Sequence, residues 1–320
     1  MSIDKTSFDC SNIGDNTVTL TVTDNNGNSA TNTTTVTIED TIAPVVNCVA
    51  PFSLSLDDAG NATITVNDIN NGSTDNCGIA SMSIDKTSFD CATIGDNIVT
   101  LTVTDNNGNS ATNTTTVTIE DVIAPVVNCV TPFSIQLDAA GNATLTVNDI
   151  NNGSTDNCGI ASMSIDKTSF DCATIGDNIV TLTVTDVNGN SATNTTTLTI
   201  EDVIAPVVNC VTPFSIQLDA AGNATLTVND INNGSTDNCG IASMSIDKTS
   251  FDCATIGDNI VTLTVTDVNG NSATNTTTLT IEDVIAPVVN CVTPFSIQLD
   301  AAGNATLTVS DINNGSTDNC

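Results

Sequence analysis

The sequence predicts an all-β protein, a tandem array of seven-stranded immunoglobulin-like β-sandwich domains that repeat every 81 positions. The first observation is the repeat itself, since the ten residues that begin at Met1 return at Met82, Met163 and Met244. A period that covers the whole chain indicates a repeat architecture. The second is a strict alternation of apolar and polar residues in several short stretches, which is typical of half-buried strands. The third is the Asn, Asp and Gly between these stretches, with no sustained helical period.

The repeat at residues 41–121 contains seven stretches that are expected to form strands. They are expected at roughly 43–49, 52–57, 62–68, 79–85, 88–92, 97–105 and 110–120. In the sixth strand Val99, Leu101 and Val103 share one face, and the threonines between them share the other. Val117 and Ile119 face inward in the seventh. Seven short strands with frequent turns are typical of an immunoglobulin-like sandwich.

The repeats are nearly identical, which fixes the expected domain boundaries. Residues 82–162 and 163–243 differ at two positions only. The complete repeats would be 41–121, 122–202 and 203–283, with residues 1–40 as the C-terminal half of a repeat and 284–320 as an N-terminal half. We therefore expect the chain to be a window from a longer array, with Met1 an internal methionine and no information about a signal peptide.

The charge of the chain excludes several function classes. It carries 37 acidic residues against four Lys, with no Arg and no His, for a net charge of −33. Such a polyanion repels nucleic acid and anionic lipid headgroups, and no apolar run is long enough to insert this segment into a membrane. Without His as a base near neutral pH or Arg to clamp an anion, the sequence predicts a protein that is not an enzyme.

Three stretches of each repeat resemble the hyalin-repeat (HYR) family. They are D-x-I-A-P-V-V-N-C, then S-T-D-N-C-G-I, then F-D-C-A-T-I-G-D-N-I-V-T-L-T-V-T-D-x-N-G-N. The sequence is most similar to versions repeated in giant surface proteins of Bacteroidetes, including gliding-motility adhesins of the SprB type. This resemblance implies an immunoglobulin-like sandwich, a location at the cell surface after export by a bacterial secretion system, and a role in adhesion.

Twelve cysteines, three in each period, predict disulfides in an oxidising, extracellular compartment, because neither CxxC pairs nor His are present for zinc. Cys77 and Cys91 flank the fourth strand at a separation of 14 positions, so they are the first choice for a bridge, with Cys158–Cys172 and Cys239–Cys253 as its copies. Closing such a loop is worth roughly 3 kcal/mol. Cys10 and Cys320 would then lack partners within the chain.

The third cysteine of each period is expected to stay unpaired, namely Cys48, Cys129, Cys210 and Cys291. In repeats of the resembled family a second cysteine commonly sits on the last strand, where this sequence has Asn113, Asn194 and Asn275. The thiols would be either buried as small apolar side chains or used in intermolecular cross-links.

Acidic and amide side chains cluster in the turns, which predicts a Ca²⁺ site. If seven strands alternate in direction, the turns of neighbouring repeats meet at one junction. The junction of 41–121 with 122–202 would gather Asp68, Asp75, Asp96, Glu120, Asp121, Asp138 and Asp186. The next would gather Asp149, Asp156, Asp177, Glu201, Asp202, Asp219 and Asp267. These carboxylates repel one another unless cations bridge them. The alternative is a set of solvated turns.

The function that follows is a non-catalytic extracellular stalk or filament of a bacterial surface adhesin, and the resemblance extends the expected role to gliding motility. Its partners would be neighbouring repeats and an unknown surface ligand. Each repeat would add roughly 30–40 Å, and short linkers with a proline such as Pro125 would limit bending. The alternative is that the repeats themselves bind glycan, ice or another surface ligand through threonine-rich faces, although the chain has no Trp or Tyr for stacking on sugars.

Overall fold

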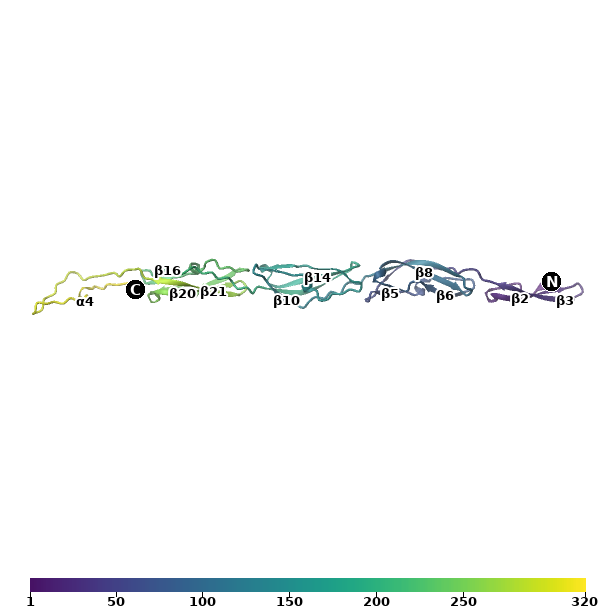
Figure 1. The fold of residues 1–320 in the computed structure, drawn as a ribbon, viewed down its shortest axis with the longest axis horizontal. Coiled ribbons are helices and arrows are strands. Elements are labelled where there is room, and N and C mark those ends of the chain that lie inside the picture. The colour runs from purple at the N-terminus through teal and green to yellow at the C-terminus, as the bar shows by residue number, and fades with distance from the viewer. The chain divides into compact units, whose positions relative to one another are not determined.

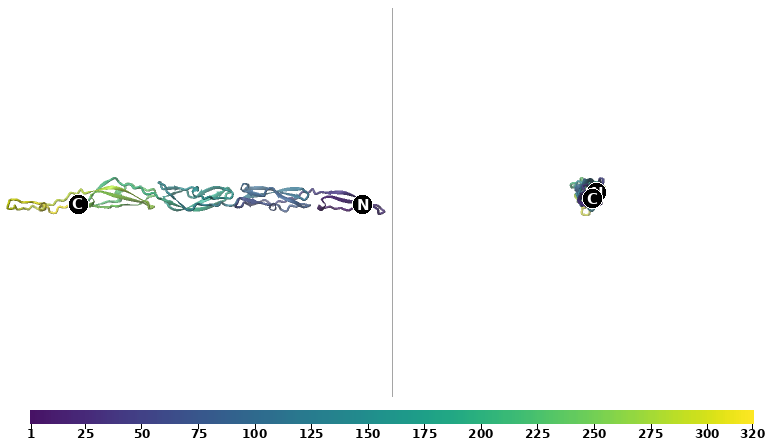
Figure 2. Two further views of the ribbon diagram at one scale, coloured as in Figure 1. Left: turned by 60° about the horizontal axis from the view of Figure 1, so that its bottom comes forward. Right: turned by 90° about the vertical axis from the view of Figure 1, so that its right-hand side faces the viewer.

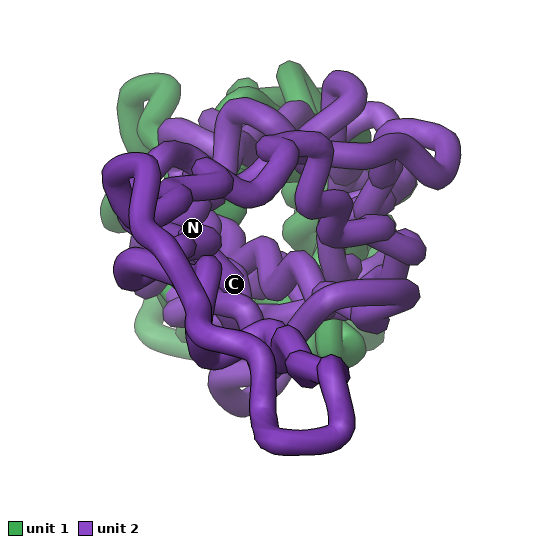
Figure 3. Tube along the Cα trace, turned by 90° about the vertical axis from the view of Figure 1, so that its left-hand side faces the viewer, with its two compact units in different colours: residues 1–129, 150–165, 181–195 green, residues 130–149, 166–180, 196–320 purple.

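The computed structural model describes residues 1–320. The chain divides into two compact units (Figure 3), one of residues 1–129, 150–165 and 181–195 and the other of residues 130–149, 166–180 and 196–320. The first unit contains the whole of repeat 41–121, and the second contains the whole of repeat 203–283. Strands dominate both units and recur at the period of the sequence (Figures 1 and 2).

The elements occupy equivalent positions in each complete repeat, shifted by the period of 81 residues. Repeat 41–121 contains β4 (Phe52–Ser55), β5 (Asn61–Thr63), α1 (Val66–Ile69), β6 (Ile79–Ile84), β7 (Ser88–Asp90), the 3-10 helix η2 (Cys91–Thr93), β8 (Gly95–Asp105) and β9 (Ser110–Glu120). Repeat 122–202 contains β10 (Phe133–Gln136), β11 (Asn142–Thr144), α2 (Val147–Ile150), β12 (Ile160–Ile165), β13 (Ser169–Asp171), η3 (Cys172–Thr174), β14 (Gly176–Asp186) and β15 (Ser191–Glu201). Repeat 203–283 contains β16 (Phe214–Gln217), β17 (Asn223–Thr225), α3 (Val228–Ile231), β18 (Ile241–Ile246), β19 (Ser250–Asp252), η4 (Cys253–Thr255), β20 (Gly257–Asp267) and β21 (Ser272–Glu282).

Each repeat is a two-sheet sandwich, so the predicted all-β fold is confirmed. In repeat 41–121 one sheet has the strand order β4-β9-β8-β6 and the other pairs β5 with β7. β4 runs parallel to β9, whereas β8 is antiparallel to both β9 and β6. The long hairpin β8–β9 turns at Asp105, whose Oδ1 accepts hydrogen bonds from the backbone N–H groups of Asn107 and Asn109 at 2.8 Å. This Asx-type turn is what the D-x-N-G-N pattern favours.

The core lies between the two sheets and follows the predicted alternation. Val99, Leu101 and Val103 of β8 are completely buried, as is Val117 of β9. The same core cluster contains Phe89 of β7, together with Leu56, Ile64 and Ile69 from the part of the repeat before β6. The equivalent core of repeat 203–283 consists of Val208, Leu218, Leu226, Ile231, Phe251, Val261, Leu263, Val265, Leu279 and Ile281. Side chains on one face of each long strand thus bury together, because residues two apart share a face.

The two partial repeats lack half of this arrangement. Residues 1–40 form β1 (Ser2–Ile3), η1 (Cys10–Asn12), β2 (Gly14–Thr23) and β3 (Ser29–Ile38), and Leu20 on β2 is 43% exposed. The equivalent Leu101 is completely buried. Residues 284–320 form only α4 (Val309–Ile312), because the strand equivalent to β16 pairs with a β21-like strand from the other half of a repeat. A repeat therefore needs both halves to build its core.

Two of the seven predicted strands differ in the structure. The segment 43–49 is present only as two isolated bridges, Val45 to Thr74 and Cys48 to Asn70. The predicted strand 62–68 ends at Thr63, and α1 follows it. Asp68 at the third position of α1 accepts hydrogen bonds from both the backbone N–H and the hydroxyl of Thr65, each at 2.7 Å. The capping box favours a helix, whereas the alternation of apolar residues favours a strand, and the segment forms the helix.

The capping carboxylate should make folding stability depend on pH. Hydrogen bonds from the Thr227 hydroxyl and then from its backbone N–H hold the pKa of Asp230 below its ordinary value of 3.8. A lowered folded-state pKa stabilises the fold above the unfolded-state pKa, and the contribution is lost as pH falls through the folded-state value. We expect Asp230→Asn to lower the urea midpoint near pH 6, and this difference from the parent chain to shrink as pH falls below 3.8. A difference that stays constant down to pH 3 would contradict the role of the charge.

The disulfides correct the predicted pairing. The structure joins Cys10 to Cys77, Cys91 to Cys158, Cys172 to Cys239 and Cys253 to Cys320. The predicted pairs Cys77–Cys91, Cys158–Cys172 and Cys239–Cys253 are absent, and Cys10 and Cys320 both have partners within the chain. Each bridge therefore connects one repeat to the next, rather than closing a loop within a repeat.

The reason is that Cys77 and Cys91 lie at opposite ends of their repeat. Next to Cys77, the Gly78 carbonyl accepts a hydrogen bond from Asn106, in the turn after β8. Cys91 lies beside Gly60, in the turn after β4, at the end of the repeat where β8 begins and β9 ends. The eleven residues of β8 separate these ends by roughly 35 Å. A disulfide requires Cα atoms within about 7 Å.

The remaining cysteines are free thiols, namely Cys48, Cys129, Cys210 and Cys291. Cys48 and Cys210 pack against the cores of their repeats. Burial raises the pKa of the Cys48, Cys129 and Cys210 thiols, so they stay protonated at neutral pH. A protonated thiol is a poor nucleophile, which favours the packing role over cross-linking for these three.

Candidate metal site at the junctions between repeats

Three aspartates meet at each junction between successive repeats. At the junction of 122–202 with 203–283 they are Asp202, Asp237 and Asp267, with carboxylate oxygens all within 4.8 Å of one another. Asp202 follows β15, Asp237 lies in the loop before β18, and Asp267 ends β20. The same arrangement recurs as Asp121, Asp156, Asp186 and as Asp40, Asp75, Asp105. We call each such set a junction triad.

Local turn chemistry positions each carboxylate of the triad. Oδ2 of Asp237 accepts from the backbone N–H groups of Cys239 and Gly240 at 2.9 and 3.0 Å. Oδ1 of Asp267 accepts from the N–H groups of Asn269 and Asn271 at 2.8 Å, and its Oδ2 accepts from the Asn271 side chain at 2.8 Å. The triad is therefore assembled by two tight turns of one repeat and the C-terminal end of the last strand of the repeat before it.

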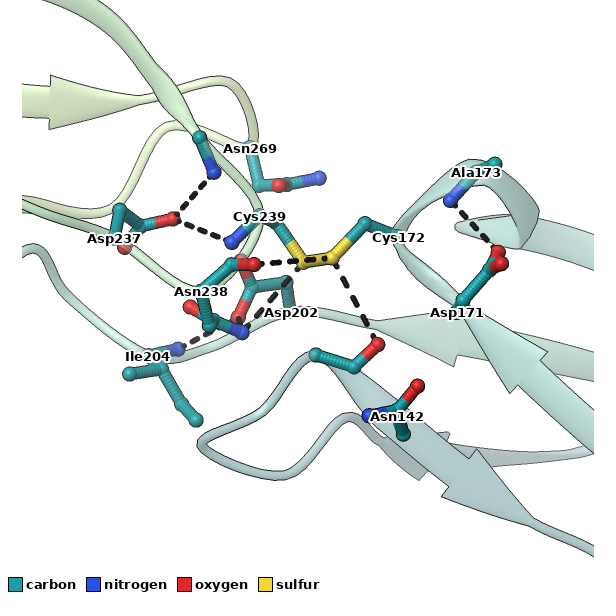
Figure 4. Close-up of a disulfide and its surroundings, with 12 residues drawn as sticks. Asn142, Asp171, Cys172, Ala173, Asp202, Ile204, Asp237, Asn238, Cys239 and Asn269 are labelled. Atoms are coloured by element: carbon teal, nitrogen blue, oxygen red, sulfur yellow. Dashed lines mark hydrogen bonds between the residues drawn. A yellow bond between two sulfur atoms is a disulfide. The ribbon is translucent and has the colours of Figure 1, made fainter.

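Asn238 connects the two repeats beside the triad (Figure 4). Its Nδ2 donates to Oδ1 of Asp202 at 3.1 Å. It also donates to the backbone carbonyl of Asp138 at 3.5 Å, and both acceptors lie in the preceding repeat. Oδ1 of Asp202 also accepts from the Ile204 N–H at 3.1 Å. The residue after Asn238 is Cys239, which is bonded to Cys172 of the preceding repeat. One dipeptide thus supplies a covalent bond and two hydrogen bonds to its neighbour.

Two oxygen atoms of the triad and one of the adjacent Asn238 are buried and have no hydrogen-bond partner. They are Oδ2 of Asp202, Oδ1 of Asp237 and Oδ1 of Asn238. Asp202 is only 8% exposed and Asp267 only 1%. The Asp121 triad repeats this pattern with Oδ2 of Asp121, Oδ1 of Asp156 and Oδ1 of Asn157. Buried polar atoms are normally satisfied, and unpartnered acceptors at an anionic cluster are suited to hold a cation.

The charge of one member of the triad, Asp267, fits a cation site. Burial alone would raise the pKa of Asp267, but hydrogen bonds from the Asn271 side chain and from the N–H groups of Asn269, Asn271 and Gly270 outweigh it, and the pKa is lowered. The turn aspartate is therefore ionised at neutral pH. The chain holds four Lys and no Arg to balance its 37 acidic residues, so a metal ion at the triad would supply counter-charge that the chain itself lacks.

The donor set fits Ca²⁺. Carboxylate and amide oxygens are the ligands of a hard cation, and two Ca–O bonds of about 2.3–2.6 Å span roughly the separation within which the triad oxygens lie. The triad offers at least one oxygen from each of its three carboxylates, and water would complete a shell of six to eight. No nitrogen or sulfur ligand for zinc belongs to the triad.

A glycine allows the neighbouring backbone to approach the bridge. Gly141 has φ +74°, and a Cβ there would lie 2.7 Å from Sγ of Cys172 and 3.1 Å from the carbonyl oxygen of Asn238. We expect Gly141→Ala to lower the free energy of unfolding by about 1–3 kcal/mol, from left-handed backbone strain and from this overlap.

Gly153 provides a matched control for that substitution. It has φ +72° with nothing within 4 Å of an added Cβ, so Gly153→Ala carries the backbone cost alone. Chemical denaturation of both variants separates the two effects. Equal losses would show that the contact with the bridge is unimportant.

The structure divides the seven residues predicted for the junction of 41–121 with 122–202. Only Asp121 and Asp186 come together, and their third partner is Asp156, which was predicted for the next junction. Asp75 belongs to the preceding triad with Asp40 and Asp105. The remaining four have local partners: Asp68 caps α1, Asp96 accepts from Thr118, Glu120 accepts from Ser53, and Asp138 closes its own turn.

The second predicted set divides in the same way. Asp202 and Asp267 meet, whereas Asp149 caps α2, Asp177 accepts from the Thr199 hydroxyl and Asp219 closes a turn. Glu201 takes part in the β10–β15 pairing. Asp237 and the amide of Asn238 were absent from the prediction. The signal that could have found them is the tripeptide Asp-Asn-Cys, which places both directly before a bridged cysteine.

One topological error explains these differences. The prediction placed the loop before β6 at the C-terminal end of the repeat. The backbone β-bridges of Val45 with Thr74 and of Cys48 with Asn70 instead hold this loop beside the N-terminal segment of the repeat. Helix α1 allows the chain to return to that end. Asp75 therefore faces the preceding repeat.

Comparison with known proteins gives one consistent result at the sequence level. No protein-family model matches the chain. Hyalin of Lytechinus variegatus is 31% identical over 294 residues, which cover 88% of this chain and 55% of that protein. Hyalin of Strongylocentrotus purpuratus is 29% identical over 286 residues, covering 85% of this chain and 24% of that protein. The chain thus spans about half the length of the first relative and a quarter of the second.

Solved structures with resemblance to the chain include the extracellular domain of protocadherin GammaB4, with 17% identity, a TM-score of 0.33 and coverage of 94% of this chain and 59% of that one. An I-band fragment of titin has 11% identity, a TM-score of 0.35 and coverage of 76% and 100%. No helix of the present structure combines the length and apolar character needed to cross a membrane. At the sequence level, this chain is similar to hyalin over most of its own length.

Proposed function

We propose that the chain is a non-catalytic extracellular repeat region that serves as a stalk or filament in adhesion, with Ca²⁺ held at its junctions. The observation that carries the proposal is the junction itself. A disulfide, two hydrogen bonds from Asn238 and a shared carboxylate triad connect neighbouring repeats at one place. A globular protein that worked through single domains would not need such a connection at every boundary.

Bound Ca²⁺ would act on the orientation of the repeats. Asp202 belongs to one repeat, whereas Asp237 and Asp267 belong to the next, so a cation between them bonds across the boundary. It would remove the mutual repulsion of the carboxylates and fix the angle between the repeats. Without the cation, the bridge and Asn238 would still hold the repeats together but leave the repulsion uncompensated.

The setting of the protein follows from its chemistry and its resemblance. Four disulfides require an oxidising compartment. The similarity to hyalin and the hyalin-repeat motifs support an adhesive role at the cell surface. A bacterial source, export by a bacterial secretion system and gliding motility stay predictions from the sequence resemblance alone.

Small-angle scattering of the full chain with millimolar Ca²⁺ and with a chelator tests this function. We expect a maximum dimension near four repeats of about 35–40 Å each, and a greater spread of dimensions in the chelator. A compact particle in Ca²⁺ would overturn the stalk. Specific binding of the isolated chain on a glycan array would instead favour the alternative in which the repeats themselves bind the ligand.

A further inference from the structure

The disulfides divide the chain into large closed loops and short open connectors. Every bridge joins cysteines 67 positions apart. The sequence repeats every 81 positions, so 14 positions separate the end of one loop from the start of the next. The connectors are 77–91, 158–172 and 239–253, and the loops are 10–77, 91–158, 172–239 and 253–320.

From this connectivity we propose that the chain is a length-limited tether, in which tension bypasses most of every repeat. A pull on the two ends passes along residues 1–10, through the bridges and along the connectors only. Residues inside the loops carry no tension, because the shorter covalent path through the sulfur atoms is taut first. The biological use of this property rests on the proposed function as a stalk, but the property itself depends only on the bridges.

The loops contain most of what holds a repeat together. In repeat 41–121 the core residues Leu56, Ile64 and Ile69 lie in loop 10–77, and Val99, Leu101 and Val103 lie in loop 91–158. The connector contributes β6 and β7, with Phe89 as its buried core residue. Each core is thus assembled from two loops and the connector between them. Unfolding under load has to break the pairing of β6 with β8 and of β7 with β5.

The gain in length from such unfolding is small. A fully extended connector of 14 positions with one bridge of 5.4 Å between Cα atoms spans about 50 Å. The folded repeat is already about 40 Å long, judged from its eleven-residue strands. Without the bridges, one fully extended repeat would reach about 280 Å. The bridges therefore reduce the extensibility of each repeat by more than an order of magnitude.

These values give a sharp expectation for the whole chain. With all four bridges intact, the extended path from residue 1 to residue 320 is about 200 Å, and after reduction it is about 1,100 Å. The pairing expected from sequence spacing, Cys77–Cys91 and its copies, would shorten the path by only 14 positions at each bridge. It would leave about 900–1,000 Å.

Single-molecule stretching of the full chain, held at both termini, tests the proposal. We expect a contour length of about 200 Å under oxidising conditions and an increase of about fivefold with a reductant. A contour length above about 900 Å before reduction, as the alternative pairing requires, overturns the proposal. So does a length that the reductant does not change.

A matched pair of variants assigns the effect to one bridge. Cys91→Ser with Cys158→Ser should add about 220 Å to the oxidised contour length, since one loop of 67 positions opens. Cys129→Ser removes a free thiol and should add nothing. An equal change in both variants would contradict the assignment. If scattering showed a compact chain while the oxidised contour length kept the value expected for intact bridges, the stalk function would fail and the covalent limit would stand.

Discussion

Cys172→Ser combined with Cys239→Ser is expected to lower the free energy of unfolding by about 4 kcal/mol. In the chain-entropy model, a bridge that closes 67 positions stabilises more than the roughly 3 kcal/mol of a loop of about 15 residues, because a longer loop restricts the unfolded chain more. Chemical denaturation measures the loss. Cys210→Ser is the control, since Cys210 is a free, half-buried thiol, and its replacement should cost much less.

Hydrogen exchange distinguishes a bridge between repeats from one within a repeat. Because Cys172 and Cys239 lie in successive repeats, amides near η3 and amides in the loop before β18 should both lose protection in the double variant. Loss of protection in one repeat only would contradict the connectivity. Core amides of β20 and β21 exchange through global unfolding, so their protection should fall in step with the loss of unfolding free energy.

The second large effect concerns Ca²⁺. If the junction triads bind it, Ca²⁺ at about 100 times its dissociation constant stabilises the folded chain by about 2.7 kcal/mol for each site. Calorimetry should count three ions per chain, one for each triad, with a rise in the melting temperature. Asp202→Asn should reduce the count to two and diminish the rise.

The sign of the Asp202→Asn effect should reverse when Ca²⁺ is removed. Charges less than about 5 Å apart repel by about 3 kcal/mol for each pair at an effective dielectric constant near 20. Removing one charge in chelator should therefore stabilise the chain, whereas in Ca²⁺ it destabilises the chain. A merely structural role for Asp202 would give the same sign in both buffers.

Asp177→Asn is the matched control for the metal site. Asp177 was predicted from the sequence to belong to this junction, but its Oδ1 accepts from Thr199 at 2.6 Å and it is outside the triad. Its substitution should leave the number of bound ions at three. Loss of an ion in this variant would favour the site expected from the sequence, which includes both Asp177 and Asp202, over the triad.

The sequence by itself determined the features that depend on short-range patterns. The period of 81 positions is explicit in the letters. The alternation in β8 predicted which side chains are buried, and Val99, Leu101 and Val103 are fully buried. The Asx turn at Asp105 followed from its Asn and Gly residues. Such patterns need no knowledge of the rest of the chain, because burial alternates with the geometry of the strand itself.

Only the tertiary structure decided which turns meet and which cysteines pair. Both depend on which end of the repeat each loop reaches. Helix α1 and the backbone β-bridges Val45–Thr74 and Cys48–Asn70 place the loop that contains Asp75 and Cys77 at the end opposite to the one expected. Their partners therefore lie in the neighbouring repeat. Separation along the chain cannot reveal this, because a strand can place residues 14 positions apart at opposite ends of a domain, whereas folding can bring residues 67 positions apart into contact.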